Sequence, residues 1–293
     1  MRKFISVITS ITLIVALMVN IFTVNQIKAE EEQVFKISAI PDFDQTELTR
    51  GFGSFAEYLS EELGMDVEYV PVTDYASVVT AFERGEIDLV WFGGLTGVQA
   101  RSLVPEAEAI AQRPMDAEFK SYFIKQKGSE IEELEDLKGQ SFAFGSESST
   151  SGHLMPRYFL SEVGINPEEV FDGEPVYSGS HDKTIALVEA GTVKAGAVNQ
   201  QYWEQAIEKG EVNEDKVESF FITPDYYDYN WTVGDVDAKF GEGTKEKIKE
   251  VLLNVRPQDS EVLELLSTDK FIETKNENYD RIEKVAKDLG LIE

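Results

Sequence analysis

The chain has 293 residues, of which 55 are Asp or Glu and only 27 are Lys or Arg, and its formal net charge is −28 at pH 7. A surface this acidic repels nucleic acid and anionic lipid headgroups, so we expect neither as a partner. Because the chain has no cysteine, only two histidines and no acidic run with EF-hand spacing, we expect no disulfide, no metal site and no cofactor.

Residues 1–29 are typical of an export segment. Arg2 and Lys3 precede an apolar run from Phe4 to about Val24, and Ala29 offers a small residue for cleavage. The run is longer than the usual core of a signal peptide, so retention as an uncleaved membrane anchor is the alternative to removal. Either outcome places the folded part on the periplasmic or extracellular face of the cell membrane.

From Phe35 onward, short apolar runs alternate with amphipathic stretches, which is typical of strand–helix–strand units in a mostly parallel sheet. The first group of predicted elements comprises strands at 35–41, 66–72 and 87–92 with helices at 46–63 and 74–85. The second group comprises strands at 121–127, 141–145, 195–200 and 217–224 with helices at 150–163, 182–190 and 201–210. Three amphipathic helices are predicted in the tail, at 244–255, 260–267 and 279–289.

These two groups predict an α/β protein with two lobes. We expect the first lobe to span 34–120 together with 225–293 and the second to span 121–224, so that the chain crosses between them twice. Each lobe is expected to hold a mixed, mostly parallel sheet flanked by helices. In this architecture ligands bind in the cleft between the lobes.

The stretch GSESSTSGHLMPRYFL (145–160) carries five hydroxyl side chains and two glycines in its first eight positions. It follows a predicted strand and opens a helix near Thr150, where free backbone N–H groups and the positive end of the helix dipole favour an anion. Ser149, Thr150 and Ser151 add hydroxyl donors, and Gly152 lets the backbone come close. Ordinary helix capping, the alternative, needs only one hydroxyl.

Two catalytic motifs are absent from this stretch. It is no Walker loop, because His153 follows Gly152 where that motif needs a lysine. It is no nucleophile elbow, because the sequence G-x-S-x-G does not occur. These absences argue against nucleotide hydrolysis and against a serine hydrolase.

Other strand-to-helix junctions carry further candidate donors. His181, in the loop SGSHD, starts a predicted helix and could donate a hydrogen bond to an anion, although a solitary histidine is more often structural. His153 is expected to be structural. In the first lobe the candidates are Gly93, Gly94, Leu95 and Thr96, in WFGGLTG, and Tyr75, in VTDYASVV. The alternative for Tyr75 is simple aromatic packing at a helix start.

Asp228 lies in the aromatic segment YYDYNW (226–231). A carboxylate near an anion site can accept a hydrogen bond from a protonated ligand while rejecting a fully ionised one. The alternatives are that Asp228 caps a turn or pairs with a lysine.

At these residues the chain resembles the phosphonate-binding family of periplasmic solute-binding proteins, the capture components of ABC importers for phosphonate, phosphite and related oxyanions. The matching segments are DYASVV, ERGEIDLVWFGG, GSESSTSGHLMPRYFL, SGSHD and AVNQ, and they span nearly the whole mature chain. The resemblance implies a type II binding-protein fold that closes on its ligand by hinge motion. It also implies oxyanion contacts from Ser149, Thr150 and Ser151, and ligand-binding roles for His181, Tyr75 and Asp228.

The sequence departs from the family pattern in two places. An aromatic hydroxyl expected just before the crossover strand falls near Phe119, which has none, unless Tyr122 takes its place. The segment TPDYYDYNWTV is similar to that of a subgroup that has been labelled selenate-binding, and it does not fix the identity of the ion.

We therefore expect a monomeric, non-enzymatic binding protein that captures a small tetrahedral oxyanion of the phosphonate, phosphite, phosphate or selenate class and delivers it to a membrane permease. The alternative within binding proteins is a ligand sensor for a membrane receptor. The alternative from another class is a small-ester hydrolase.

Overall fold

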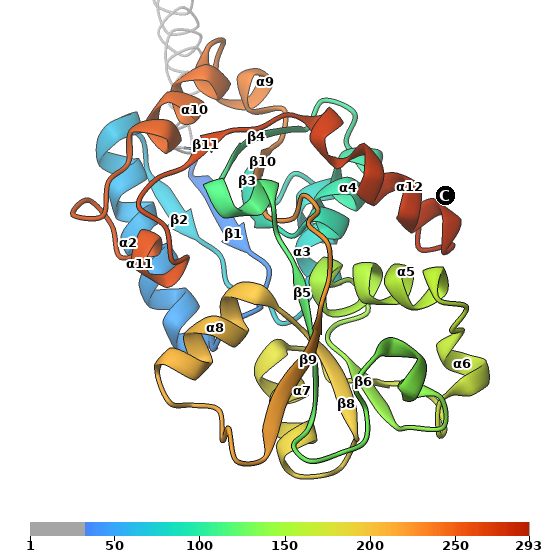
Figure 1. The fold of residues 1–293 in the computed structure, drawn as a ribbon. Coiled ribbons are helices and arrows are strands. Elements are labelled where there is room, and N and C mark those ends of the chain that lie inside the picture. The colour runs from blue at the N-terminus through green and yellow to red at the C-terminus, as the bar shows by residue number, and fades with distance from the viewer. Residues whose placement is uncertain (1–32, 293) are drawn as a thin grey trace, which may run out of the picture. The chain divides into compact units, whose positions relative to one another are not determined.

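The computed structural model describes residues 33–292, and the predicted export segment at 1–29 lies outside them. Residues Phe35–Glu293 form one compact unit. Within the described range no helix is both long and apolar enough to cross a membrane. The unit is built on two separate sheets with helices against them (Figure 1).

We call the part built on the six-stranded sheet the first lobe. Its strand order is β11-β4-β10-β3-β1-β2. The strands are β1 (Phe35–Ala39), β2 (Val67–Tyr69), β3 (Leu89–Phe92), β4 (Glu108–Gln112), β10 (Asn230–Val233) and β11 (Ile272–Glu273). The helices are α2 (Gln45–Leu63), α3 (Tyr75–Glu83), α4 (Gly94–Leu103), α9 (Val236–Phe240), α10 (Thr244–Asn254), α11 (Val262–Leu265) and α12 (Asp280–Asp288), with short 3-10 turns η1 (Pro114–Ala117) and η4 (Asn276–Tyr279).

The second lobe is built on the five-stranded sheet, whose order is β7-β6-β8-β5-β9. Its strands are β5 (Ser121–Gln126), β6 (Phe142–Phe144), β7 (Val176–Tyr177), β8 (Ala195–Asn199) and β9 (Val217–Ile222). Its helices are α5 (Met155–Glu162), α6 (Pro167–Val170), α7 (His181–Glu189) and α8 (Gln200–Glu208), preceded by the 3-10 turn η2 (Leu134–Leu137) and the π-helical turn η3 (Thr150–Leu154). All strands of this sheet lie inside the range predicted for the second lobe; the exact lobe boundaries stay a prediction.

The two-lobed α/β architecture with mixed sheets is confirmed, but the expectation of mostly parallel sheets is wrong. Among the strand pairs in residues 33–292, four are parallel and five are antiparallel. The antiparallel pairs all involve β4, β5, β9, β10 or β11. Of these strands, β4, β5, β9 and β10 lie next to the points where the chain leaves one lobe or returns to it, whereas β11 comes later, from the C-terminal tail.

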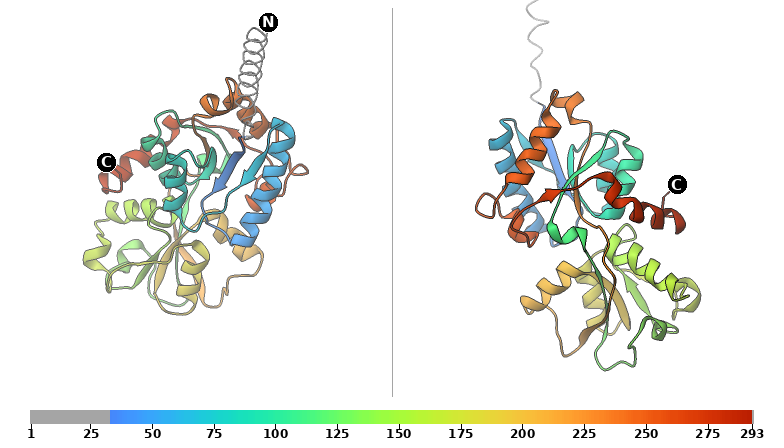
Figure 2. Two further views of the ribbon diagram at one scale, coloured as in Figure 1. Left: turned by 180° about the vertical axis from the view of Figure 1, so that it is seen from behind. Right: turned by 45° about the horizontal axis from the view of Figure 1, so that its top comes forward.

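The two crossover segments run side by side. The backbone N–H of Phe119 donates to the carbonyl of Tyr226 at 2.9 Å, and the N–H of Tyr226 donates back at 3.0 Å. Further along, the N–H of Thr223 donates to the carbonyl of Ser121 at 3.0 Å. Figure 2 shows the same connection from two other directions. A short antiparallel ribbon therefore links the lobes.

Helix α2 illustrates how the sequence sets the local structure of the first lobe. The side chain of Asp44 accepts from the N–H of Thr46 at 2.8 Å and begins the helix. Gly64, at φ 70°, ends it in the left-handed conformation that glycine tolerates. The apolar side chains, spaced by three or four, are buried against the sheet: Phe52, Phe55, Leu59 and Leu63.

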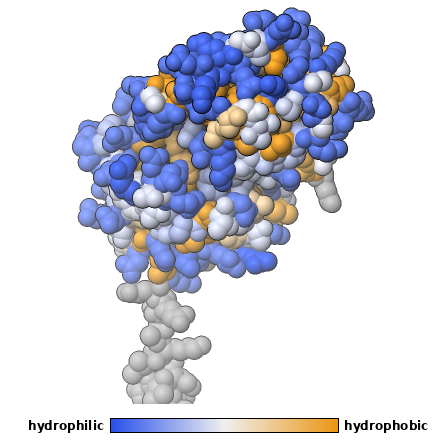
Figure 3. Space-filling view, turned by 90° about the horizontal axis from the view of Figure 1, so that it is seen from below, coloured by the Kyte–Doolittle hydropathy of each residue, from blue (hydrophilic) through white to orange (hydrophobic). Residues whose placement is uncertain are grey.

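The surface agrees with the composition. On the face in Figure 3 most residues are hydrophilic and the apolar residues are scattered in small areas. The interior of the first lobe, by contrast, holds a dense aromatic cluster around Trp91 and Trp231, both fully buried.

Candidate ligand-binding site

The candidate site lies where loops from the ends of strands in the two sheets meet. The loop after β1 begins beside the end of β3, because the N–H of Ile40 donates to the carbonyl of Trp91 at 3.1 Å. Two hydrogen bonds near these loops connect the first lobe to the second. The N–H of Leu95 donates to the hydroxyl of Thr150 at 2.9 Å, and the side-chain amide of Asn199 donates to the hydroxyl of Tyr229 at 2.8 Å.

The serine-rich stretch forms the predicted helix start, with one difference in geometry. The hydroxyl of Ser149 accepts from the N–H of Gly152 at 2.9 Å, which is the expected cap. The first turn, however, is a π turn over Thr150–Leu154, and the α-helix begins only at Met155. The carbonyl of Gly152 accepts instead from the N–H of Gly145 at 2.9 Å. Such wide turns are frequent at functional sites.

Gly152 is required by close approach. A Cβ atom there would lie 3.0 Å from the hydroxyl of Ser149, 3.1 Å from Cε1 of His181 and 3.2 Å from Cα of Gly145. The two junctions that the sequence predicted separately, at Ser149 and at His181, are therefore brought together.

His181 is a buried hydrogen-bond donor in its neutral form. Its side chain is 1 % exposed, and burial lowers its pKa to about 4, although the negative charge of Asp182 acts to raise that pKa. Nδ1 accepts from the backbone N–H of Asn199 at 3.4 Å, so the single ring proton of the neutral form is on Nε2. Nε2 has no hydrogen-bond partner among the described residues.

Tyr75, the first residue of α3, brings a free hydroxyl from the first lobe, the second donor without a partner in the described chain after Nε2 of His181. Its ring is buried, and within residues 33–292 its hydroxyl has no partner. Burial and the negative charges of Asp42, Asp228 and Asp182 hold its pKa well above the ordinary value. The Ser149 hydroxyl is near enough to lower that pKa slightly but makes no hydrogen bond of normal geometry with it.

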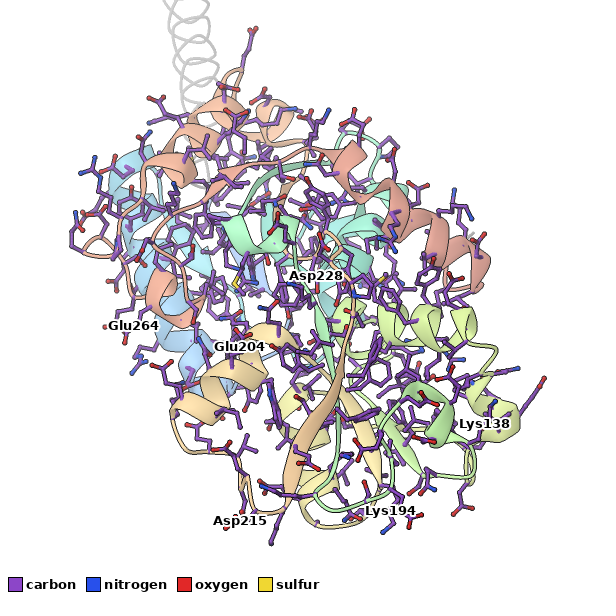
Figure 4. All side chains as sticks on the ribbon, viewed as in Figure 1. Lys138, Lys194, Glu204, Asp215, Asp228 and Glu264 are labelled. Atoms are coloured by element: carbon purple, nitrogen blue, oxygen red, sulfur yellow. The ribbon has the colours of Figure 1, made fainter. Side chains whose placement is uncertain are left out.

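Asp228 lies at the same meeting point, near the centre of Figure 4. One carboxyl oxygen accepts from the N–H of Gly94 at 2.9 Å and so caps α4, while the other is buried with no partner in the described part of the chain. Burial raises its pKa to about 7, against the Gly94 amide and the Thr150 hydroxyl, which lower it. No lysine pairs with it in residues 33–292.

Three predicted candidates do not present free donors to this site. The N–H groups of Gly94 and Leu95 bind Asp228 and Thr150, and the hydroxyl of Thr96 donates to the carbonyl of Gly93 at 3.1 Å within its own helix start. The Gly93–Thr96 junction thus positions other residues.

The expectation that Tyr122 replaces a hydroxyl near Phe119 is wrong in this structure. The hydroxyl of Tyr122 donates to Glu204 at 2.9 Å in an exposed position. Neighbouring residues of a strand point to opposite faces, and it is Ser121 that faces the interior. Its hydroxyl bonds the hydroxyl of Tyr226 at 2.7 Å and the carbonyl of Ser151 at 2.7 Å.

Sequence reasoning missed two groups at the site. Asp42 follows β1 directly, and both of its carboxyl oxygens are buried without a partner among residues 33–292. Arg113 is fully buried, donates to Asp116 at 2.6 and 2.8 Å and also binds Gln201 and the carbonyl of Leu266. The position of Asp42, at the carboxyl end of a strand beside the WFGG junction, was the signal that could have found it.

The profile of the family described as "ABC transporter, phosphonate, periplasmic substrate-binding protein" matches residues 37–279. The probable ABC transporter phosphite binding protein PhnD1 of Prochlorococcus marinus is 41% identical over 270 residues, which cover 89% of this chain and 91% of that protein.

Two solved structures have the same fold. The structure of PhnD1 from Prochlorococcus marinus in complex with methylphosphonate has a TM-score of 0.85 and covers 89% of this chain and 100% of that one. A binding protein component of an ABC phosphonate transporter from Pseudomonas aeruginosa has a TM-score of 0.76 at 20% identity, covering 87% and 86%. The chain therefore belongs to the phosphonate family of periplasmic substrate-binding proteins of ABC transporters.

Proposed function

We propose that the protein captures a small tetrahedral oxyanion of the phosphonate or phosphite type between its two lobes and delivers it to a membrane permease, as a monomer and without catalysis. The family membership and the relatives that are named for phosphite or solved with methylphosphonate support this ligand class. Hinge closure would occur at the ribbon formed by Phe119 and Tyr226.

The observation that carries the proposal is a set of buried polar groups, from both lobes, that lack partners within residues 33–292. They are Nε2 of His181 from the second lobe and, from the first, the hydroxyl of Tyr75 and one oxygen of Asp228. Leaving a buried polar group unsatisfied costs about 1–3 kcal/mol. Because such groups are rare in folded proteins, their convergence on one place indicates a polar ligand.

The chemistry of the set matches a protonated oxyanion. His181 and Tyr75 can donate to negatively charged oxygens, and the Ser149–Ser151 turn adds hydroxyl groups at a helix start. Asp228 can share a proton with an oxygen of the ligand. No serine hydroxyl in the described residues hydrogen-bonds to a histidine, so the nucleophile–base pair of a serine hydrolase is missing there.

Thermal unfolding with and without ligand tests the proposal. Methylphosphonate or phosphite at 100 times its Kd should stabilise the protein by about 2.7 kcal/mol. Tyr75→Phe, which removes only the free hydroxyl, should reduce the ligand-induced shift in Tm. Tyr122→Phe is the matched control, because that hydroxyl binds Glu204 at the surface. No shift with any phosphonate, phosphite or phosphate, or equal shifts for both variants, would contradict the proposal.

A further inference from the structure

Asp42 brings to the candidate site a carboxyl group to which the proposed function assigns no role. Its loop is fixed by the N–H of Asp42, which donates to the carbonyl of Ile40 at 3.0 Å, and by the bond from Ile40 to Trp91. A Cβ atom on Gly93 would lie 3.4 Å from the side chain of Ile40, 3.2 Å from the hydroxyl of Thr150 and 3.5 Å from Asp228. The loop of Asp42 is therefore next to the point where the lobes touch.

The Asp42 carboxyl has no partner of its own in the described range, although it is 1 % exposed. The charge of Arg113 lowers the pKa of Asp42. The side chain of Arg113, however, makes its hydrogen bonds to Asp116, Gln201 and Leu266 and none to Asp42. The titratable and charged groups that act on Asp42, or on which it acts, come from several elements: Tyr69, Tyr75, Arg113, Asp116 and Tyr229.

Two of these neighbours connect Asp42 to the site. Its charge is the largest one acting on the hydroxyls of Tyr75 and Tyr229, and Tyr229 is bonded to Asn199 of the second lobe. Burial raises the pKa of Asp42 to about 7, against the hydroxyl of Tyr229 and the charge of Arg113. The Tyr229 hydroxyl lies close but makes no hydrogen bond of normal geometry with Asp42.

We propose that Asp42 is a specificity-determining residue. Together with Asp228 it forms an acidic wall, at which each carboxyl group must share a hydrogen atom with the bound anion. This inference rests on the proposed function. The wall comes from the first lobe, whereas the donor turn at Ser149–Ser151 and the ring of His181 come from the second. The anion would be held between donors and acids.

Such a wall discriminates by protonation. Phosphate-type groups have a second pKa of about 6, so they still carry a proton for part of the time near neutral pH and can donate it to a carboxylate. Selenate and sulfate are fully ionised there and only accept hydrogen bonds. An ionised carboxylate beside such a dianion repels it, so binding would require Asp42 and Asp228 to take up protons first.

Asp42→Asn tests the role, because it keeps the shape and removes the charge. The Kd values for methylphosphonate and selenate are measured at pH 7 by calorimetry. The ratio of the selenate Kd to the methylphosphonate Kd should fall by at least about tenfold, since a repulsion of about 1.4 kcal/mol is tenfold in Kd. Where the unmodified protein binds selenate too weakly to measure, the detection limit sets the lower bound for its Kd.

The matched control is Asp182→Asn. Asp182 is exposed, and its charge also acts on Tyr75 and His181, yet it lies at the start of α7 and not at the wall. The ratio should stay within twofold in this variant. An unchanged ratio in Asp42→Asn, or equal weakening of both ligands, overturns the inference.

Proton uptake gives a readout that does not need a variant. Calorimetry of the unmodified protein in buffers of different ionisation enthalpy counts protons taken up with selenate, or with sulfate where that binds better. Because these anions bring no proton, an uptake near one or more per ligand supports the acidic wall, and zero uptake overturns it. Failure to bind any oxyanion would instead refute the proposed function itself.

Discussion

Replacing Thr150 by Val tests whether the contact between the lobes contributes to ligand affinity. The Thr150 hydroxyl accepts from the backbone N–H of Leu95 across the two lobes, and both residues are buried. Valine has nearly the same shape but no acceptor. When the lobes are apart, water can satisfy the amide of Leu95; when they are together, the amide would be left without a partner.

The expected loss of affinity follows from this difference between the open and closed arrangements of the lobes. A buried N–H without a partner costs about 1–3 kcal/mol, and in this case the penalty falls on the closed arrangement alone. Because ligand binding would be coupled to closure, Kd should rise by a factor of about 5 to 150. The Tm of the protein without ligand should change little.

Calorimetric titration with methylphosphonate measures this factor, and two variants control it. Thr150→Ser keeps the hydroxyl and should bind within a few-fold of the unmodified protein. Thr96→Val removes a buried hydroxyl whose bond, to Gly93, stays inside the first lobe, so it should leave Kd nearly unchanged. A Kd for Thr150→Val within twofold of the original, or an equal loss in Thr96→Val, would refute the reasoning.

The remaining predictions concern the two histidines, Asp228 and Arg113. His181→Ala should raise Kd by tenfold or more, because a hydrogen bond to a charged group contributes about 1.5–3 kcal/mol. His153→Ala should mainly lower Tm, since His153 binds Glu147, Arg157 and Tyr177 within its own lobe. The reverse pattern would exchange the roles of the two histidines. Burial raises the pKa of Asp228 from 3.8 to about 7, so its neutral form contributes stability that is complete below pH 4 and lost as pH rises through 7, by at most about 1.4 kcal/mol per pH unit. Asp228→Asn should therefore flatten the fall of Tm between pH 4 and 7 without ligand, and an unaltered slope would count against the raised pKa. Arg113→Met should lower the free energy of unfolding in urea by about 3–5 kcal/mol, because it leaves Asp116 buried and unpaired; a loss below 1 kcal/mol would show that this pair contributes little.

The sequence alone predicted those features that local pattern determines. The apolar spacing in 46–63 and the glycine that follows it predicted α2 almost to the residue, whereas its N-cap, Asp44, was not predicted. Polar residues at helix starts that come after a strand, such as Ser149, His181 and Tyr75, were predicted as candidates, and the structure brings them close together. The sheet type was not predictable in this way, because β10 and β11 enter the first sheet from the far end of the chain and run against β4.

The site features that escaped prediction depend on contacts between residues far apart in the chain. Whether Ser121 or Tyr122 faces the interior is decided by the register of β5 against β8 and β9, and a shift of one residue would exchange them. Tyr226 pairs with Phe119 across the ribbon, and its hydroxyl is bonded to that of Ser121. A sequence shows which residues can donate or accept, but pairing across the ribbon determines which of them share one small volume.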